Sequence, residues 1–258
     1  MAGEHQKHPG GGFNPPEPTT KGGPDYGRFI DAVRKLQDHA RAVDAPDEVI
    51  SEAADTLEKL SVLLSPYDAD EWESPSGRRM DLPMRGNVLT VPLTSRKTAD
   101  GRIEGTARFA RFHLGRNGAV HGGSLGMLFD TVLGLTASVL TGSRRQRTAY
   151  LTINYRNIVP IEKDLQFDAG IDRVDGRKIF VSGKLTTATR CWPKPMRCSS
   201  NSNPASRSSR GPFGGVADGV ERGQLVEEFG RAGRDRRTVV FACQCVKRGA
   251  GDQVRQFG

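Results

Sequence analysis

Apolar and polar positions along this chain follow two different periods, and each period predicts its own kind of element. Over 26–65 the apolar residues recur at steps of three and four, which is the spacing of one helical face. The pattern breaks near Pro46 and resumes after it, so it predicts two helices that form a hairpin. Residues 1–25 are rich in glycine, proline and charge and follow neither period, which predicts disorder.

From about residue 80 the pattern changes to the two-residue alternation of β-strands. Five stretches show strand character: 87–93, 103–115, 148–158, 164–174 and 177–185. Turn signals at 99–101 and at Asp175-Gly176 join the first pair and the last pair into hairpins. Between the second and third stretches, residues 121–140 are apolar on nearly every face, which predicts a helix that is buried on most sides.

Two strands, one apolar helix and three more strands predict an α+β fold, in which an antiparallel sheet wraps around the helix. We therefore expect one domain over 80–186, preceded by the helical hairpin. The first residues lack the apolar stretch of a signal peptide, and no uninterrupted apolar run is long enough to cross a bilayer. These features predict a cytoplasmic protein with no membrane span.

The character of the sequence changes abruptly after Thr186. Residues 187–258 hold all four cysteines of the chain, and they hold 13 basic residues against 6 acidic ones. Residues 1–186 are almost neutral, with 25 basic and 24 acidic residues, so the net charge of +8 comes from the tail. A disordered basic tail is one explanation for such a segment. A change of reading frame is the other.

The genetic code favours a change of reading frame. Inserting one base near codon 187 allows a Thr-Asp-Gly-Asp-Thr turn and then a strand with alternating apolar residues. We therefore predict that 187–258 is an irregular, basic, out-of-frame tail and that the sheet lacks its last strand. The chain would then be unstable or inactive, and its basic charge would not indicate a nucleic-acid partner.

Residues 117–130, NGAVHGGSLGMLFD, combine a histidine, two glycines and a carboxylate at the start of the apolar helix. Glycine lets another group approach the backbone, and the first N–H groups of a helix suit a developing oxyanion. Asp130 lies about 2.5 turns after His121, so the two side chains face different directions. A carboxylate in an apolar helix is costly unless it is paired or used, so catalysis and a structural hydrogen bond both explain Asp130.

The same stretch resembles a known motif. It is similar to the HGG-x6-D motif of PaaI-type acyl-CoA thioesterases, and TAYLTINYRNIVP at 148–160 resembles the segment that follows this motif in that family. Over 87–185 the chain resembles a hotdog-fold domain. The resemblance implies hydrolysis of an acyl-CoA to a free acid and CoA, at a site between the subunits of a homodimer or homotetramer.

The resemblance also implies a role for each residue of the motif. Asp130 would be the general base or the nucleophile, and the Gly122 N–H would bind the oxyanion. His121 would orient or polarise the carbonyl, although a histidine before two glycines is often only a helix cap. Thr148 of the partner subunit would help to place the water or Asp130, although threonine at a strand start is commonly a simple β-former.

Substrate-binding candidates surround this motif: Gly123, Asn117, Arg156, Arg177 and Lys178. The three cations suit the phosphates of coenzyme A, although exposed cations at strand ends are commonly just solvated. Some branches of the family have an asparagine six residues before the histidine. Here that position is glycine, and Asn117 is the nearest amide.

Three other functions were compared with the sequence. A hotdog hydratase needs an Asp-His pair at closer spacing than residues 121 and 130 provide, and a nucleic-acid-binding function rests only on the basic tail. A non-catalytic module that binds acyl thioesters, or an assembly module, would use the hairpin at 26–65 as its surface. The sequence has no metal-ligand set, P-loop or dinucleotide motif, so we expect no metal and no cofactor.

Overall fold

The computed structural model describes residues 17–143, 146–187 and 238–248. All the described residues belong to one compact unit of the chain. The predicted disorder of 1–16 and the predicted irregularity of 188–237 and 249–258 lie outside the described residues.

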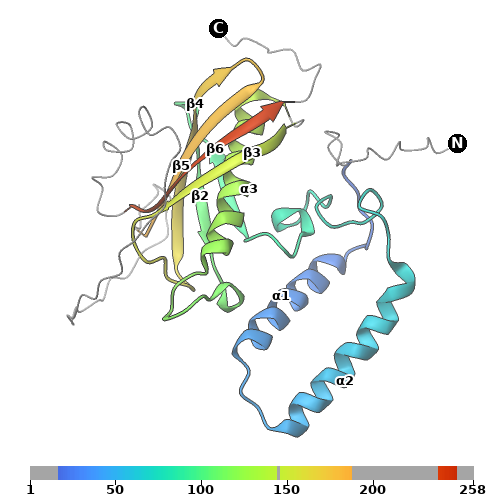
Figure 1. Cartoon of the computed structure of the whole chain (residues 1–258). Helices are drawn as coiled ribbons and strands as arrows, with labels where there is room; N and C mark the ends of the chain where they lie inside the picture. The colour runs from blue at the N-terminus through green and yellow to red at the C-terminus, as the bar shows by residue number, and fades with distance from the viewer. Residues whose placement is uncertain (1–16, 144–145, 188–237, 249–258) are drawn as a thin grey trace, which may run out of the picture. The chain divides into compact units, whose positions relative to one another are not determined.

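Six antiparallel strands form one sheet in the order β1-β2-β4-β5-β6-β3 (Figure 1). The strands are β1 Leu93–Lys97, β2 Ile103–Arg108, β3 Gln146–Tyr155, β4 Asp164–Asp175, β5 Lys178–Thr186 and β6 Thr238–Arg248. Inward residues alternate with outward ones along the central strands, and β5 shows a regular buried and half-buried pattern. This alternation gives the sheet one apolar face and one polar face.

Helix α3, Gly122–Thr141, packs on the apolar face of the sheet and confirms the predicted buried helix. Leu128, Phe129, Val132 and Leu133 are buried against residues of β2, β4 and β5. By length and composition alone α3 is apolar enough to cross a bilayer, as the core helix of a globular domain also is. The α+β arrangement of a sheet around one helix is confirmed.

The first hairpin is shorter than predicted at both of its outer ends. Strand β1 begins at Leu93, not at residue 87, because Pro92 has no N–H to give to a ladder. Strand β2 ends at Arg108, not at residue 115, and the chain turns into the short helix η3, Arg111–His113. The N–H of Ala110 donates to His113 Nδ1 at 3.2 Å, so a side chain takes the place of a strand partner there.

The prediction that the sheet ends at Thr186 was wrong. Strand β6 lies between β5 and β3 and pairs with both of them along most of its length. Its sequence, TVVFACQCVKR, is rich in β-branched and aromatic residues, which suit a strand between two neighbours. The proposed change of reading frame stays a prediction for resequencing, but the tail does contribute a strand.

Two helices precede the sheet, as predicted: α1 Tyr26–Ala42 and α2 Asp47–Leu64. Helix α1 contacts η3, where Asp38 Oδ1 accepts a hydrogen bond from the Phe112 N–H at 2.8 Å. Arg41 donates to the carbonyl oxygens of Leu114 and Gly115, each at 3.4 Å. Helix α2 is different, because every one of its residues is exposed.

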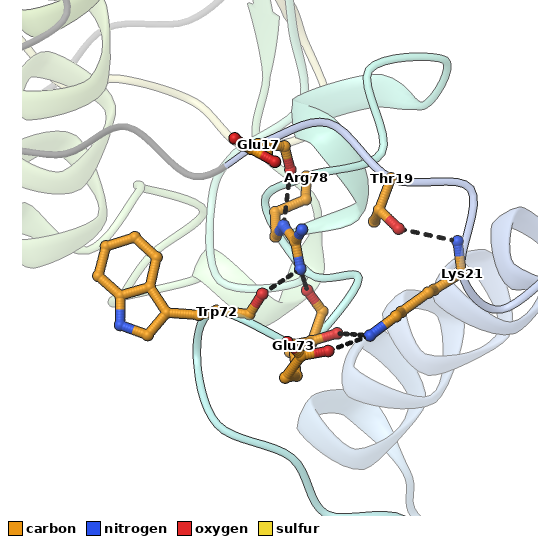
Figure 2. Close-up of polar contacts among 7 residues, drawn as sticks. Glu17, Thr19, Lys21, Trp72, Glu73 and Arg78 are labelled. Carbon is orange, nitrogen blue, oxygen red and sulfur yellow. Dashed lines mark hydrogen bonds and ion pairs between the residues drawn. The ribbon is translucent and has the colours of Figure 1, made fainter. Parts of the chain in front are cut away.

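Residues 17–25 are held in place, which corrects the prediction of disorder for this part of 1–25. Figure 2 shows Lys21 paired with Glu73, and Arg78 donating to the carbonyl oxygens of Glu17 and Trp72. Arg79 is buried and donates to the carbonyl oxygens of Lys21 and Gly23 at 3.0 and 2.9 Å. These contacts join the segment before α1 to the loop after α2.

Candidate active site

Asp130 lies near the middle of α3, on an exposed part of an otherwise buried helix. Thr148 Oγ1 donates a hydrogen bond to Asp130 Oδ1 at 2.7 Å. Both residues belong to the same chain, and the predicted role of Thr148 of the partner subunit stays a prediction. A hydroxyl that donates to a carboxylate holds it in one orientation and makes a strong, charge-assisted hydrogen bond.

The register of the sheet places Thr148 on the side of α3. Thr148 pairs with Val246 of β6, and Val246 pairs with Ile179 of β5. Directly paired residues of antiparallel strands share one face of the sheet, and the Ile179 side chain is fully buried on the apolar face. The register of β3 shifts between Thr148 and Tyr150, so the hydroxyl sits at a local irregularity of the strand.

The first turn of α3 forms the second part of the candidate site. His121 is the N-cap, and its Nδ1 accepts a hydrogen bond from the Gly123 N–H at 3.0 Å. That bond leaves the proton of a neutral imidazole on Nε2, on an exposed side chain. Gly122 is the first residue of the helix, so its N–H has no acceptor one turn earlier in the helix and lies at the positive end of the dipole.

Tyr155 completes the surroundings of Gly122, and sequence reasoning gave it no role. Its hydroxyl donates to the Gly122 carbonyl oxygen at 3.2 Å. A Cβ added to Gly122 would lie 3.4 Å from the same hydroxyl, which is ordinary contact. The tyrosine stood within the quoted segment at 148–160, but only the fold shows that it reaches the helix start 33 residues earlier.

His113 holds the backbone of His121 through a hydrogen bond, and it was also missed as a site residue. Its carbonyl oxygen accepts the His121 N–H at 2.8 Å, and its ring packs edge-on against Phe109 and Phe112. Burial lowers the pKa of the His113 imidazole, which favours the neutral form. Its function is therefore positional, since the carbonyl fixes the backbone from which the Gly122 N–H projects.

The two parts of the site lie on the same helix but apart from each other. Gly122 and Asp130 are separated by eight residues, which is about 12 Å along a helix that rises about 1.5 Å per residue. A thioester carbonyl is far shorter than this separation. One chain therefore places the Gly122 N–H at the start of α3 and a carboxylate about two turns further along the helix.

The remaining predicted binding residues do not converge within one chain. Asn117 has a φ of 53° at the tip of the loop between η3 and α3, so its asparagine serves a left-handed turn. Lys178 pairs with Lys247, which pairs with Arg147, and Arg177 lies in the adjoining turn. Arg147 and Lys178 lie one position from Thr148 and Ile179 along their strands, so they face the other side of the sheet, whereas Arg156 follows the other end of β3.

No metal site is found in the part of the chain that the structure describes, where no three His, Cys, Asp or Glu side chains come together. The expectation of no metal and no cofactor stays a prediction.

Residues 117–190 match the family model of the thioesterase superfamily. The match begins at Asn117 and spans both parts of the site described above. The chain carries a thioesterase superfamily domain. This result confirms the resemblance at the level of the superfamily, and the predicted hotdog fold, an α+β sheet around a central helix, is confirmed.

Relatives of the thioesterase domain include two curated proteins. The chain is 34% identical over 71 residues to acyl-coenzyme A thioesterase THEM4 of Xenopus laevis, which covers 28% of this chain and 31% of that protein. It is 30% identical over 98 residues to MIOREX complex component 3 of Saccharomyces cerevisiae, which covers 33% of this chain and 36% of that protein. The chain thus spans about a third of the length of these relatives.

A solved structure extends the likeness beyond the thioesterase domain. The thioesterase superfamily protein RHA08564 matches 90% of this chain and 96% of its own, with a TM-score of 0.58 and 21% identity. At that identity the likeness concerns the fold alone.

Proposed function

We propose that this protein is an acyl-CoA thioesterase, which hydrolyses a thioester to a free acid and CoA, with Asp130 as the general base. The observation that carries the proposal is the 2.7 Å hydrogen bond from Thr148 to Asp130, because it orients a carboxylate on a family motif. The likeness to acyl-coenzyme A thioesterase THEM4 supports an acyl-CoA as the substrate.

In the proposed reaction, Asp130 takes a proton from a water molecule, and the water oxygen attacks the thioester carbonyl carbon. Negative charge develops on the carbonyl oxygen, where the Gly122 N–H at the helix start stabilises it. The tetrahedral intermediate collapses, the carbon–sulfur bond breaks, and the thiolate of CoA takes the proton that Asp130 had accepted. His121, held by the Gly123 N–H, lies next to this oxyanion site and orients the carbonyl.

The separation of the two parts of the site supports a site that two copies of the chain share. Asp130 of one copy and Gly122 of the other would face the same carbonyl. Strand β3 supports this arrangement, because it is an edge strand of the described sheet and carries the exposed side chains of Tyr150 and Tyr155. A second β3 can pair with this edge, so we propose a homodimer or a tetramer built from such dimers.

Substitution of Asp130 tests the catalytic role. We expect Asp130→Asn to lose hydrolysis of acyl-CoA, followed as thiol release, by more than about a hundredfold while its circular dichroism stays unchanged. Asp164→Asn, which changes an exposed carboxylate at the start of β4, is the matched control and should keep full activity. Full activity in Asp130→Asn would refute the mechanism. Acyl-CoA binding without turnover in the wild-type chain would favour the binding-module alternative.

Mixing two inactive variants tests whether the site is shared. Gly122→Pro removes the proposed oxyanion donor, and proline suits the first position of a helix. His121 has φ −62° and ψ 135°, which is the conformation favoured before proline. If the site joins two copies, a refolded mixture of Asp130→Asn and Gly122→Pro chains forms one intact site per mixed dimer and regains activity. No recovery would place both groups in one chain's site.

Arg156 is the cation proposed to meet the coenzyme A phosphates, because it follows Tyr155, whose hydroxyl contacts the Gly122 part of the site. Phosphate groups attract such cations strongly. We expect Arg156→Ala to raise KM for acyl-CoA without changing kcat, and to leave hydrolysis of an acyl thioester without phosphates unchanged. Lys178→Ala is the control, because Lys178 follows the strand alternation away from the face of Ile179 and Thr148.

A further inference from the structure

Helix α2 presents an apolar face that no described residue of its own chain buries. All of Asp47–Leu64 is exposed. Five residues at steps of four and three form one stripe on this helix, which we call the α2 stripe: Val49, Ala53, Leu57, Leu60 and Leu64. Four of them are large apolar side chains, and Leu57 is 41% exposed. In water, a helix of this length depends on the packing of such a face for its stability.

The segments on both sides of α2 make contacts with other parts of the same chain, but the helix itself is not buried. Before α2, Arg41 binds the carbonyl oxygens of Leu114 and Gly115. After α2, Glu73 pairs with Lys21, close to the start of α1. The segments before and after α2 are thus held to the rest of the chain, while the apolar stripe of α2 lies on the surface.

The charge of the chain indicates what covers the α2 stripe. Residues 44–73 contain ten acidic residues and one lysine, whereas residues 76–186 contain eighteen basic and nine acidic residues. The segment around α2 therefore carries about −9 and the domain that follows carries about +9. This arrangement complements the basic surface of a thioesterase domain.

The same charges oppose a lipid surface as the partner. Amphipathic helices that bind membranes carry lysine and arginine on their polar face, because these attract anionic lipids. The polar face of α2 carries Glu48, Glu52 and Asp55, with Lys59 as the single cation of the helix. An anionic membrane would repel this face.

We infer that α2 docks through the α2 stripe on the thioesterase domain of a second copy of the chain. The sheet domain of the same chain leaves the stripe exposed, and a second copy supplies the same basic domain from another direction. The inference goes beyond the proposed reaction, and it does not depend on turnover. It gives the helical hairpin the role of an arm that joins two subunits.

A photo-crosslinking experiment on the full chain tests the inference. One preparation carries benzoylphenylalanine in place of Leu57, and it is mixed and refolded with ¹⁵N-labelled wild-type chain before irradiation. We expect crosslinks from position 57 to labelled peptides within 76–186. The matched control carries the probe in place of Asp55, on the opposite side of α2, and should give few such crosslinks. Crosslinks only to the same unlabelled chain, its 187–258 segment included, or none at all, would overturn the inference.

Sedimentation velocity provides the second measurement. Leu57→Glu and Leu60→Glu together should raise the dimer dissociation constant by about tenfold or more, since they place carboxylates in the proposed apolar contact. Val62→Glu changes an equally apolar residue of the same helix, outside the stripe and 73% exposed, and should leave dissociation unchanged. Circular dichroism checks that the helix persists. Equal dissociation constants for the stripe variant and the control would also overturn the inference.

Discussion

Replacing Thr148 with valine removes one hydroxyl and keeps the shape and the strand preference of the side chain. The hydroxyl donates to Asp130 Oδ1 at 2.7 Å, and a hydrogen bond to a charged group contributes about 1.5–3 kcal/mol. If this bond orients the base in the transition state, its loss lowers kcat by roughly ten- to a hundredfold, because about 1.4 kcal/mol corresponds to a factor of ten. KM should hardly change, since the hydroxyl contacts the carboxylate.

Steady-state hydrolysis of acyl-CoA, followed as thiol release, measures both constants. Thr148→Ser keeps the hydroxyl and is the matched control, so it should stay within a few fold of the wild type. Thermal unfolding of both variants should be close to that of the wild type, because Thr148 is exposed. A Thr148→Val protein with unchanged kcat, or with KM raised instead, would show that this hydrogen bond does not position the base.

Three further outcomes follow from the packing around the site. Gly105→Ala should cost more than about 3 kcal/mol in denaturant unfolding, since the new Cβ would lie 1.9 Å from the Thr94 carbonyl oxygen. Gly123→Ala should lower the melting temperature and kcat together, because its Cβ would lie 3.1 Å from His121 Nδ1 and push the ring from its cap. Burial lowers the pKa of His113, so the unfolded chain takes up the proton first and the free energy of unfolding should fall as pH drops below about 6.5. His113→Asn should flatten that pH dependence.

The elements that bury an apolar pattern were predictable from the sequence. Helix α3 and strands β3, β4 and β5 lie within a few residues of their expected ranges. Burial enforces the pattern of α3, β4 and β5, whereas β3 is mostly exposed and was predictable from its β-branched and aromatic residues. The family motif pointed to His121, Gly122 and Asp130, and their catalytic roles stay predictions. Thr148 was also a candidate, but only the fold shows that its hydroxyl donates to Asp130 of the same chain, because a sequence motif carries no information about which copy supplies a residue.

Other features depend on contacts that leave little trace in sequence. His113 acts through its backbone carbonyl, which every residue possesses, and Tyr155 acts through a hydroxyl that reaches a distant helix. Strand β6 was missed because the charge and cysteine content of 187–258 describe that segment only as a whole. The eleven residues of β6 have good strand preference, but the composition of the whole 187–258 segment does not reveal so short a stretch.

The position of β6 in the sheet also sets the order in which the domain can fold. Figure 1 shows β6 between β5 and β3, and β3 has no other strand beside it in the described sheet. The hairpin of β4 and β5 closes through a tight turn, whereas β6 returns only after the 187–237 segment and joins β3 across a still longer stretch of chain. Closing such loops costs entropy before any contact compensates for it, so the pairing of β3 is a late and slow step. Thr148 is carried by β3, so a newly made chain has its helix and hairpin before the Asp130 carboxylate can receive the hydrogen bond from Thr148.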